Sequence, residues 1–169
     1  NRSMETSDLV YDGKYYNDLI ELFYCRSKIV YAYSQSRWCY QEARRKYSKL
    51  EEKVNQFNKL KDKSADSKLE EFNQWLNEIP AISFDYSRYL RDLQLQKATI
   101  ETNVKNYKSH FDKINSLCKE DDLEFLSSFA ELAKDNFIEQ INTDLAFLTP
   151  GLSLFEQLIE SIRGIVEIE

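Results

Sequence analysis

Residues 15 to 62 contain no glycine and no proline and are rich in Tyr, Lys and Arg. Because glycine and proline are the residues that most often interrupt a helix, this stretch predicts one long amphipathic helix. Its apolar residues recur at alternating steps of three and four, the repeat of a coiled-coil seam. The seam positions are Leu19, Leu22, Ile29, Tyr33, Tyr40, Ala43, Tyr47, Leu50, Val54 and Phe57, with Arg26 and Ser36 as polar intrusions. A strict heptad repeat gives a narrow seam, which one helix cannot bury alone, so we expect the rest of the chain to pack against it.

The later part of the chain carries several signals for helix ends. Pro80 is expected to end a short second helix, and Ser83 is expected to cap a third. The Thr-Pro-Gly sequence at 149–151 is expected to stop a fourth helix, Ser153 to open a fifth, and Gly164 to end or loosen it. Only 3 Gly and 2 Pro among 169 residues disfavour a sheet protein, which needs many tight turns. The predicted helices span 15–62, 67–79, 84–119, 122–148 and 153–168.

These segments predict an all-α fold. The helices at 15–62 and 84–119 are expected to form a long antiparallel coiled-coil hairpin, and the additional helices a bundle at its base. The alternative is a first helix that breaks near residues 34–36 and a compact bundle of four or five helices.

The two ends of the chain differ in character. Residues 1–13 are predicted to be a flexible leader, of which residues 1–3 look like a vector remnant, and residues 14–169 a single helical domain. Glu167 and Glu169 place acidic groups where a helix dipole favours basic ones. We therefore expect a longer protein to continue beyond Glu169.

One segment has a local resemblance to a known family. Residues 71–78, with Trp75 among them, precede a long helix that contains Leu90 and Leu93, and this arrangement is similar to the start of a spectrin-type repeat. The long preceding helix, the break expected at Pro80 and the absence of a second repeat depart from that family. The chain is therefore not assigned to it.

Charge is distributed unevenly along the chain. From Arg26 to Lys63 there are 11 Lys or Arg against 4 Asp or Glu, a net charge of +7, whereas Glu120 to Glu169 holds 2 against 12, a net charge of −10. The basic stretch interleaves with aromatic residues and predicts a surface for anions. The alternatives are a solvated rim or a face directed at the acidic last helices. An overall charge of −6 disfavours a nucleic-acid binder and leaves an anionic membrane as the better candidate. The candidate anion-binding residues are Arg37, Arg44, Arg45, Lys46 and Lys49.

Aromatic residues also lie away from the predicted seam of the first helix. Phe23, Tyr24, Val30, Tyr31 and Trp38 widen its apolar face and are expected to be covered by the last two helices or by another chain. A surface that combines aromatic and Arg side chains is typical of protein interfaces. The candidate interface residues are Phe23, Tyr31, Trp38 and Arg45.

The sequence offers little that could support catalysis. His110 is the only histidine, which removes the usual general base and most metal-ligand sets. Cys25, Cys39 and Cys118 have no metal-site spacing and are expected to be free thiols in a reducing, cytoplasmic compartment. No phosphate-binding or nucleophile motif occurs. We therefore expect no enzyme activity, no cofactor, no metal and no small-molecule substrate.

Two functions remain as hypotheses. The first is a non-catalytic scaffold module that associates with itself or with a protein partner as part of a longer protein. The second is the soluble part of a membrane-associated protein, in which the basic stretch 26–63 contacts anionic lipid and a continuation beyond Glu169 supplies the anchor. Nucleic acid is the less favoured anion.

Overall fold

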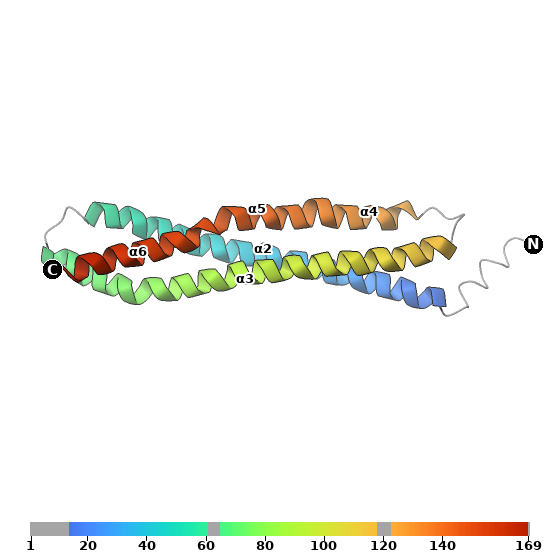
Figure 1. The fold of residues 1–169 in the computed structure, drawn as a ribbon, viewed down its shortest axis with the longest axis horizontal. Helices are drawn as coiled ribbons and strands as arrows, with labels where there is room; N and C mark the ends of the chain where they lie inside the picture. Colours follow the sequence, from blue (N-terminus) through green and yellow to red (C-terminus); the bar gives the residue numbers. More distant parts are fainter. Residues whose placement is uncertain (1–13, 61–64, 118–122, 169) are drawn as a thin grey trace, which may run out of the picture. The chain divides into compact units, whose positions relative to one another are not determined.

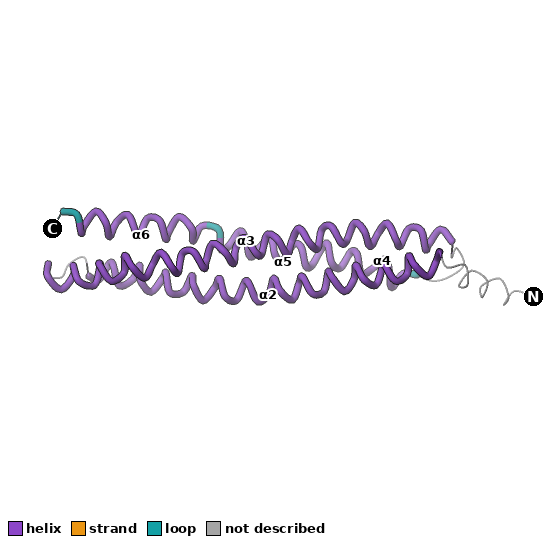
Figure 2. Tube along the Cα trace, turned by 90° about the horizontal axis from the view of Figure 1, so that it is seen from below, coloured by secondary structure: helices purple, strands orange, loops and turns teal. Residues whose placement is uncertain are grey.

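The computed structural model describes residues 14–60, 65–117 and 123–168. In these ranges the chain is helical apart from short connections (Figure 2). The elements follow one another from α2 to α6 along the chain (Figure 1). Their bounds are α2 Lys14–Leu60, α3 Ala65–Leu117, α4 Glu124–Leu132, the π-helix η1 Ala133–Ile138, α5 Glu139–Leu148 and α6 Pro150–Val166. The prediction of an all-α fold is confirmed, while the predicted leader lies outside the described residues.

Helices α2 and α3 form the predicted antiparallel hairpin. Lys46 lies 2.6 Å from Asp85, and seven residues later Lys53 lies 3.2 Å from Glu78, seven residues earlier on α3. Residue numbers that rise on one helix while they fall on the other define antiparallel neighbours. The alternative of a break near residues 34–36 is wrong because α2 is continuous there. Ser36 is buried, and its hydroxyl donates to the Tyr33 carbonyl oxygen at 2.7 Å, so the helix satisfies this polar group itself.

Contacts within the chain divide it into two compact units. Unit 1 contains residues up to Ser36 and Leu95–Asn142, and unit 2 contains Arg37–Gln94 and the residues from Thr143 onward. Each unit therefore draws on both arms of the hairpin and on part of the later helices. In unit 1 the rings of Tyr33 and Phe137 stack at 4.0 Å between centroids. The prediction of one single domain stays a prediction.

The buried face of α2 is broader than the predicted seam. One predicted line, which includes Leu22, Ile29 and Leu50, is buried from Leu22 to Leu50. The other predicted line, that of Tyr33 and Tyr47, is only half-buried. A line of smaller residues is buried instead. It lies next to the Leu22 line, on the side away from Tyr33 and Tyr47. The expectation of a narrow two-line seam is therefore wrong. Small side chains allow neighbouring helices to approach closely, and more than one helix covers this face. The additional buried residues are Cys25, Ala32 and Cys39.

Helix α3 continues through Pro80, where the sequence predicts an end, so the prediction of separate helices at 67–79 and 84–119 is wrong. A proline inside a helix removes one backbone hydrogen bond and costs about 3 kcal/mol. Burial on both sides of Pro80 offsets this cost. Trp75, Ile79 and Tyr86 are each at most 2% exposed, and burying a large apolar side chain contributes about 1.5 to 3 kcal/mol.

The last helices also differ from their predicted bounds. The helix expected at 122–148 begins at Glu124 and contains the wider turns of η1 at Ala133–Ile138 before it reaches Leu148. Helix α6 begins at Pro150 rather than at Ser153, because proline suits the first helical position, where its missing N–H would have had no helical partner. The Ser153 hydroxyl donates to the Pro150 carbonyl oxygen at 3.2 Å and caps nothing. Gly164 lies inside α6, so the helix does not end there.

Alanine substitutions at the two glycines of α6 are expected to have opposite effects on the free energy of unfolding. At Gly151 a Cβ would lie 2.6 Å from the Tyr86 hydroxyl oxygen and 2.9 Å from the Tyr47 ring, whereas at Gly164 it would meet nothing within 4 Å. We expect Gly151→Ala to lower the free energy of unfolding by about 1 to 3 kcal/mol through overpacking. Gly164→Ala is expected to raise it by about 0.5 to 1 kcal/mol. Urea unfolding followed by circular dichroism measures both, and equal effects would contradict the close approach at Gly151.

Candidate interaction surface

A row of large apolar side chains lies exposed on the outward face of α2 in unit 1. Their positions recur at steps of three and four and therefore share one face of the helix, opposite the buried line of Leu22, Cys25 and Ile29. Between 43% and 66% of each side chain is exposed. We call this row the outer stripe; its members are Tyr16, Ile20, Phe23, Tyr24, Val30 and Tyr31.

The outer stripe contains no charged residue, and its gaps are filled by small ones. Ser27 and Ser34 lie between the large side chains, and the Ser27 hydroxyl donates to the Phe23 carbonyl oxygen at 3.0 Å within the same helix. A shallow groove of about 620 Å³ runs over this part of α2. It is lined by Phe23, Arg26, Ser27, Val30, Tyr31 and Ser34. The groove offers an apolar floor with space beside the serines for a side chain from a partner.

Cations border the outer stripe and are held by aromatic rings. The Arg26 guanidinium lies 4.9 Å from the centre of the Phe129 ring on α4, and the Lys28 amine lies 4.1 Å from the centre of the Tyr24 ring. Cation–π contacts of this kind contribute about 0.5 to 1 kcal/mol at exposed sites. They keep both positive charges at the edge of the stripe, where solvent reaches them.

The four candidate interface residues fall in different units. Phe23 and Tyr31 belong to the outer stripe of unit 1 and are exposed, so the alternative in which the last two helices cover them is wrong. In unit 2, Trp38 is half-exposed and meets the Tyr89 ring edge-on at 5.6 Å between centroids. Arg45 is exposed and pairs with Glu42 at 2.6 Å. An interface role for the four stays a prediction. Sequence reasoning missed Tyr16 and Ile20, although their spacing from Phe23 extends the same helical face.

The candidate anion-binding residues mostly contact their own unit. Arg37 forms an ion pair with Asp144, which is 4% exposed, and Lys46 pairs with Asp85. The hydrogen bond from Lys46 lowers the pKa of the Asp85 carboxyl. Arg44 lies over the Phe147 ring at 4.8 Å. Lys49 is exposed. Arg37 therefore fits the alternative in which the basic face is directed at the acidic last helices. Anion binding by the five residues stays a prediction.

His110 joins the two arms of the hairpin within unit 1. Its Nδ1 atom lies 2.8 Å from Oδ1 of Asp18, and Lys113 reaches the same oxygen at 3.4 Å. The hydrogen bond from His110 is the main reason why the pKa of the Asp18 carboxyl is lowered. The only histidine of the chain thus makes a structural contact between α2 and α3.

Buried hydroxyl and thiol groups in the described ranges are used for packing. The Tyr107 hydroxyl donates to the Leu126 carbonyl oxygen at 2.8 Å, and the Tyr86 hydroxyl donates to the Leu148 carbonyl oxygen. Burial raises the pKa of both phenols. Cys25 and Cys39 are free and buried, and burial raises the pKa of each thiol, which disfavours the reactive thiolate. Cys118 lies outside the described residues.

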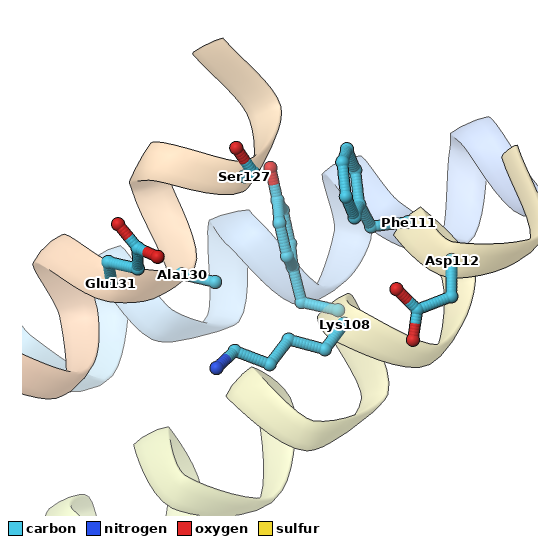
Figure 3. Close-up of a pocket in the computed structure, with 7 residues that line it drawn as sticks. Lys108, Phe111, Asp112, Ser127, Ala130 and Glu131 are labelled. Carbon is cyan, nitrogen blue, oxygen red and sulfur yellow. The ribbon is translucent and has the colours of Figure 1, made fainter. Parts of the chain in front are cut away.

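A second groove in unit 1, of about 230 Å³, lies between α3 and α4 (Figure 3). Its lining includes Lys108, Phe111 and Asp112 from α3 and Ser127 and Glu131 from α4. In Figure 3 the Lys108 side chain extends along the groove away from Asp112.

Within the described ranges, no three His, Cys, Asp or Glu residues are grouped so that they could hold a metal ion. No helix in these ranges is both long enough and apolar enough to cross a membrane. In the same ranges, the outer stripe exposes six large apolar side chains on one face of α2. Compared with protein-family models, curated proteins and solved structures, the chain matches none of them.

Proposed function

We propose that this chain is a non-catalytic interaction module that binds a second copy of itself through the outer stripe of α2. The observation that supports this function is a contiguous row of six exposed, uncharged, mostly aromatic side chains. Single exposed apolar residues are ordinary, whereas contiguous apolar patches mark interaction sites. Removing such a patch from water is the main favourable term in protein association.

The pattern of large and small residues favours another copy of the same helix as the partner. Ser27 and Ser34 leave space between the large side chains, so the side chains of an antiparallel copy can enter these gaps in the manner of knobs and holes. Because none of the six stripe residues is charged, their burial between two copies removes no charge from water, and Arg26, which lines the groove, lies at the edge of the stripe.

Charge at the edge of the stripe also fits this pairing. Glu21 and Lys28 are both exposed and lie two helical turns apart on the same edge. In an antiparallel pair centred between Tyr24 and Cys25, Glu21 of one copy lies level with Lys28 of the other. Two such ion pairs would fix the register while adding little affinity.

The cysteines are consistent with the compartment that the sequence predicts. Cys25 and Cys39 are free thiols on the buried side of α2, away from the outer stripe. Free, reduced thiols are typical of cytoplasmic proteins. The proposal is therefore a cytoplasmic module.

Mass in solution tests the proposed self-association. We expect a dimer by size exclusion with light scattering at both about 0.1 M and about 0.5 M salt, since apolar burial resists charge screening. Phe23→Ser with Tyr31→Ser should weaken the dimer about a hundredfold, because large aromatic residues at the centre of an interface carry most of its binding energy. The double variant should then be monomeric at micromolar concentration with unchanged helicity.

The control replaces two exposed aromatic residues outside the stripe, Phe84→Ser with Phe125→Ser. This variant should remain a dimer. A monomeric parent chain, or equal loss of mass in both double variants, would refute self-association through the stripe. If the parent chain were monomeric and bound vesicles of anionic lipid, and the stripe variant did not bind them, the membrane hypothesis would replace self-association.

A further inference from the structure

A third groove in unit 1, of about 530 Å³, lies between α3 and the segment formed by η1 and α5. Val104 and Ile138 are buried and form its apolar floor. Polar side chains surround this floor on both sides. They are Glu101, Lys105 and Lys108 from α3 and Lys134, Glu139 and Asn142 from η1 and α5.

The three lysines of this groove are not neutralised by the described part of the chain. Lys105, Lys108 and Lys134 make no ion pair with any residue in the described ranges. Two carboxylates also line the groove. Glu101 lies 3.6 Å from Lys97, and Glu139 accepts a hydrogen bond from the Asn142 amide at 3.2 Å. Three ammonium groups against two carboxylates leave the lining of the groove with a net positive charge, which attracts an anion.

The position of Lys134 is unusual for this part of the chain. The segment from Glu120 to Glu169 carries a net charge of −10, and Lys134 and Arg163 are its only basic residues. Lys134 is the one that borders the groove with the lysines of α3.

The backbone at Lys134 is also irregular. Lys134 and Ile138 both belong to the π-helix η1, Ala133–Ile138. π-Helical turns are rare and occur frequently at functional sites. The irregular turn thus contributes both a basic side chain and part of the apolar floor to the same groove.

The geometry points to an anion site in which Lys105, Lys108 and Lys134 bind a phosphate-bearing ligand and Val104 and Ile138 contact its apolar part. Lysine binds phosphate as a flexible point charge with three donors, so three lysines suit a ligand with several negative oxygens. Lys108 also lines the neighbouring groove of Figure 3, where its side chain extends away from Asp112. Either a soluble polyphosphate or the phosphorylated headgroup of a lipid offers this chemistry.

Calorimetric titration of the whole chain tests the site with two probes at about 0.1 M salt. One is inositol hexakisphosphate, and the other is phosphatidylcholine vesicles that contain phosphatidylinositol bisphosphate. We expect Lys105→Gln with Lys134→Gln to weaken binding about tenfold or more, since each lost charged hydrogen bond costs affinity. Lys105→Arg with Lys134→Arg should retain most of the binding.

The matched control removes the same charge from two exposed residues that do not line the groove, Lys59→Gln with Arg163→Gln, and should change binding less than twofold, because it alters only screened charge. Groove-dependent binding of the soluble probe identifies a free anion, and groove-dependent binding of vesicles alone identifies a lipid headgroup. Equal weakening in the groove and control variants, or no binding of either probe, overturns the assignment. Circular dichroism of each variant confirms that the fold is retained.

Discussion

Replacing Pro80 by alanine is expected to raise the free energy of unfolding by about 1 to 3 kcal/mol, although no side-chain contact is gained. Pro80 lies inside α3, where it lacks the N–H that would donate to the carbonyl oxygen of Leu76 and where its ring crowds that carbonyl. Alanine restores the hydrogen bond and removes the crowding. The more flexible unfolded chain offsets part of this gain, by about 0.4 to 1 kcal/mol.

The other proline of the chain is the control. Pro150 occupies the first turn of α6, where a backbone N–H has no partner within the helix. Pro150→Ala is therefore expected to change stability by less than about 0.5 kcal/mol, or to lower it slightly. Urea unfolding of both variants measures the difference. A Pro80→Ala variant no more stable than the parent would show that the helix is interrupted at Pro80, as the sequence alone predicts.

The second large effect is expected from two neighbouring positions of α2 in unit 1. Ile29 is 0% exposed, whereas Val30 is 49% exposed. Ile29→Ala should lower the free energy of unfolding by about 2 to 5 kcal/mol, because it removes buried methylene groups and leaves a cavity. Val30→Ala should change it by less than about 0.5 kcal/mol, since an exposed side chain loses little and alanine is the better helix former.

Both variants are compared by urea unfolding at a low protein concentration, so that self-association does not add to the measured stability. Val30→Ala should also weaken the proposed dimer while Ile29→Ala, if it folds, should not. Similar destabilisation by the two substitutions would mean that the outer stripe is buried in the chain itself. That outcome would refute the division of α2 into a buried face and an exposed apolar face.

Much of the fold could be predicted because helix signals are local. The heptad spacing of Leu22, Ile29 and Leu50 identifies the line that the structure buries. Helix ends were predicted less well, because their signals compete with packing. At Pro80 the local rule predicts an end, but the burial of Trp75 and Tyr86 on either side stabilises the continuous helix.

The candidate site could be predicted only in part. The spacing of Phe23 and Tyr31 places them away from the seam, but sequence cannot tell whether a later helix covers them. The basic stretch of α2 is a second example of a surface that the sequence predicts only in part. Arg37 and Lys46 resemble an open anion surface in sequence, yet the structure brings Asp144 and Asp85 against them. Charge along a sequence does not reveal which charges meet in space.

The sequence by itself determined that this chain forms long helices in an antiparallel hairpin, because periodicity, composition and the scarcity of Gly and Pro act within a few residues of each position. Tertiary structure alone decided which apolar line of α2 is buried, that α3 passes through Pro80, and that η1 brings Lys134 to the same groove as Lys105. These features depend on residues far apart in the sequence. Each is settled by a difference of a few kcal/mol between local preference and burial, which only the packed chain determines.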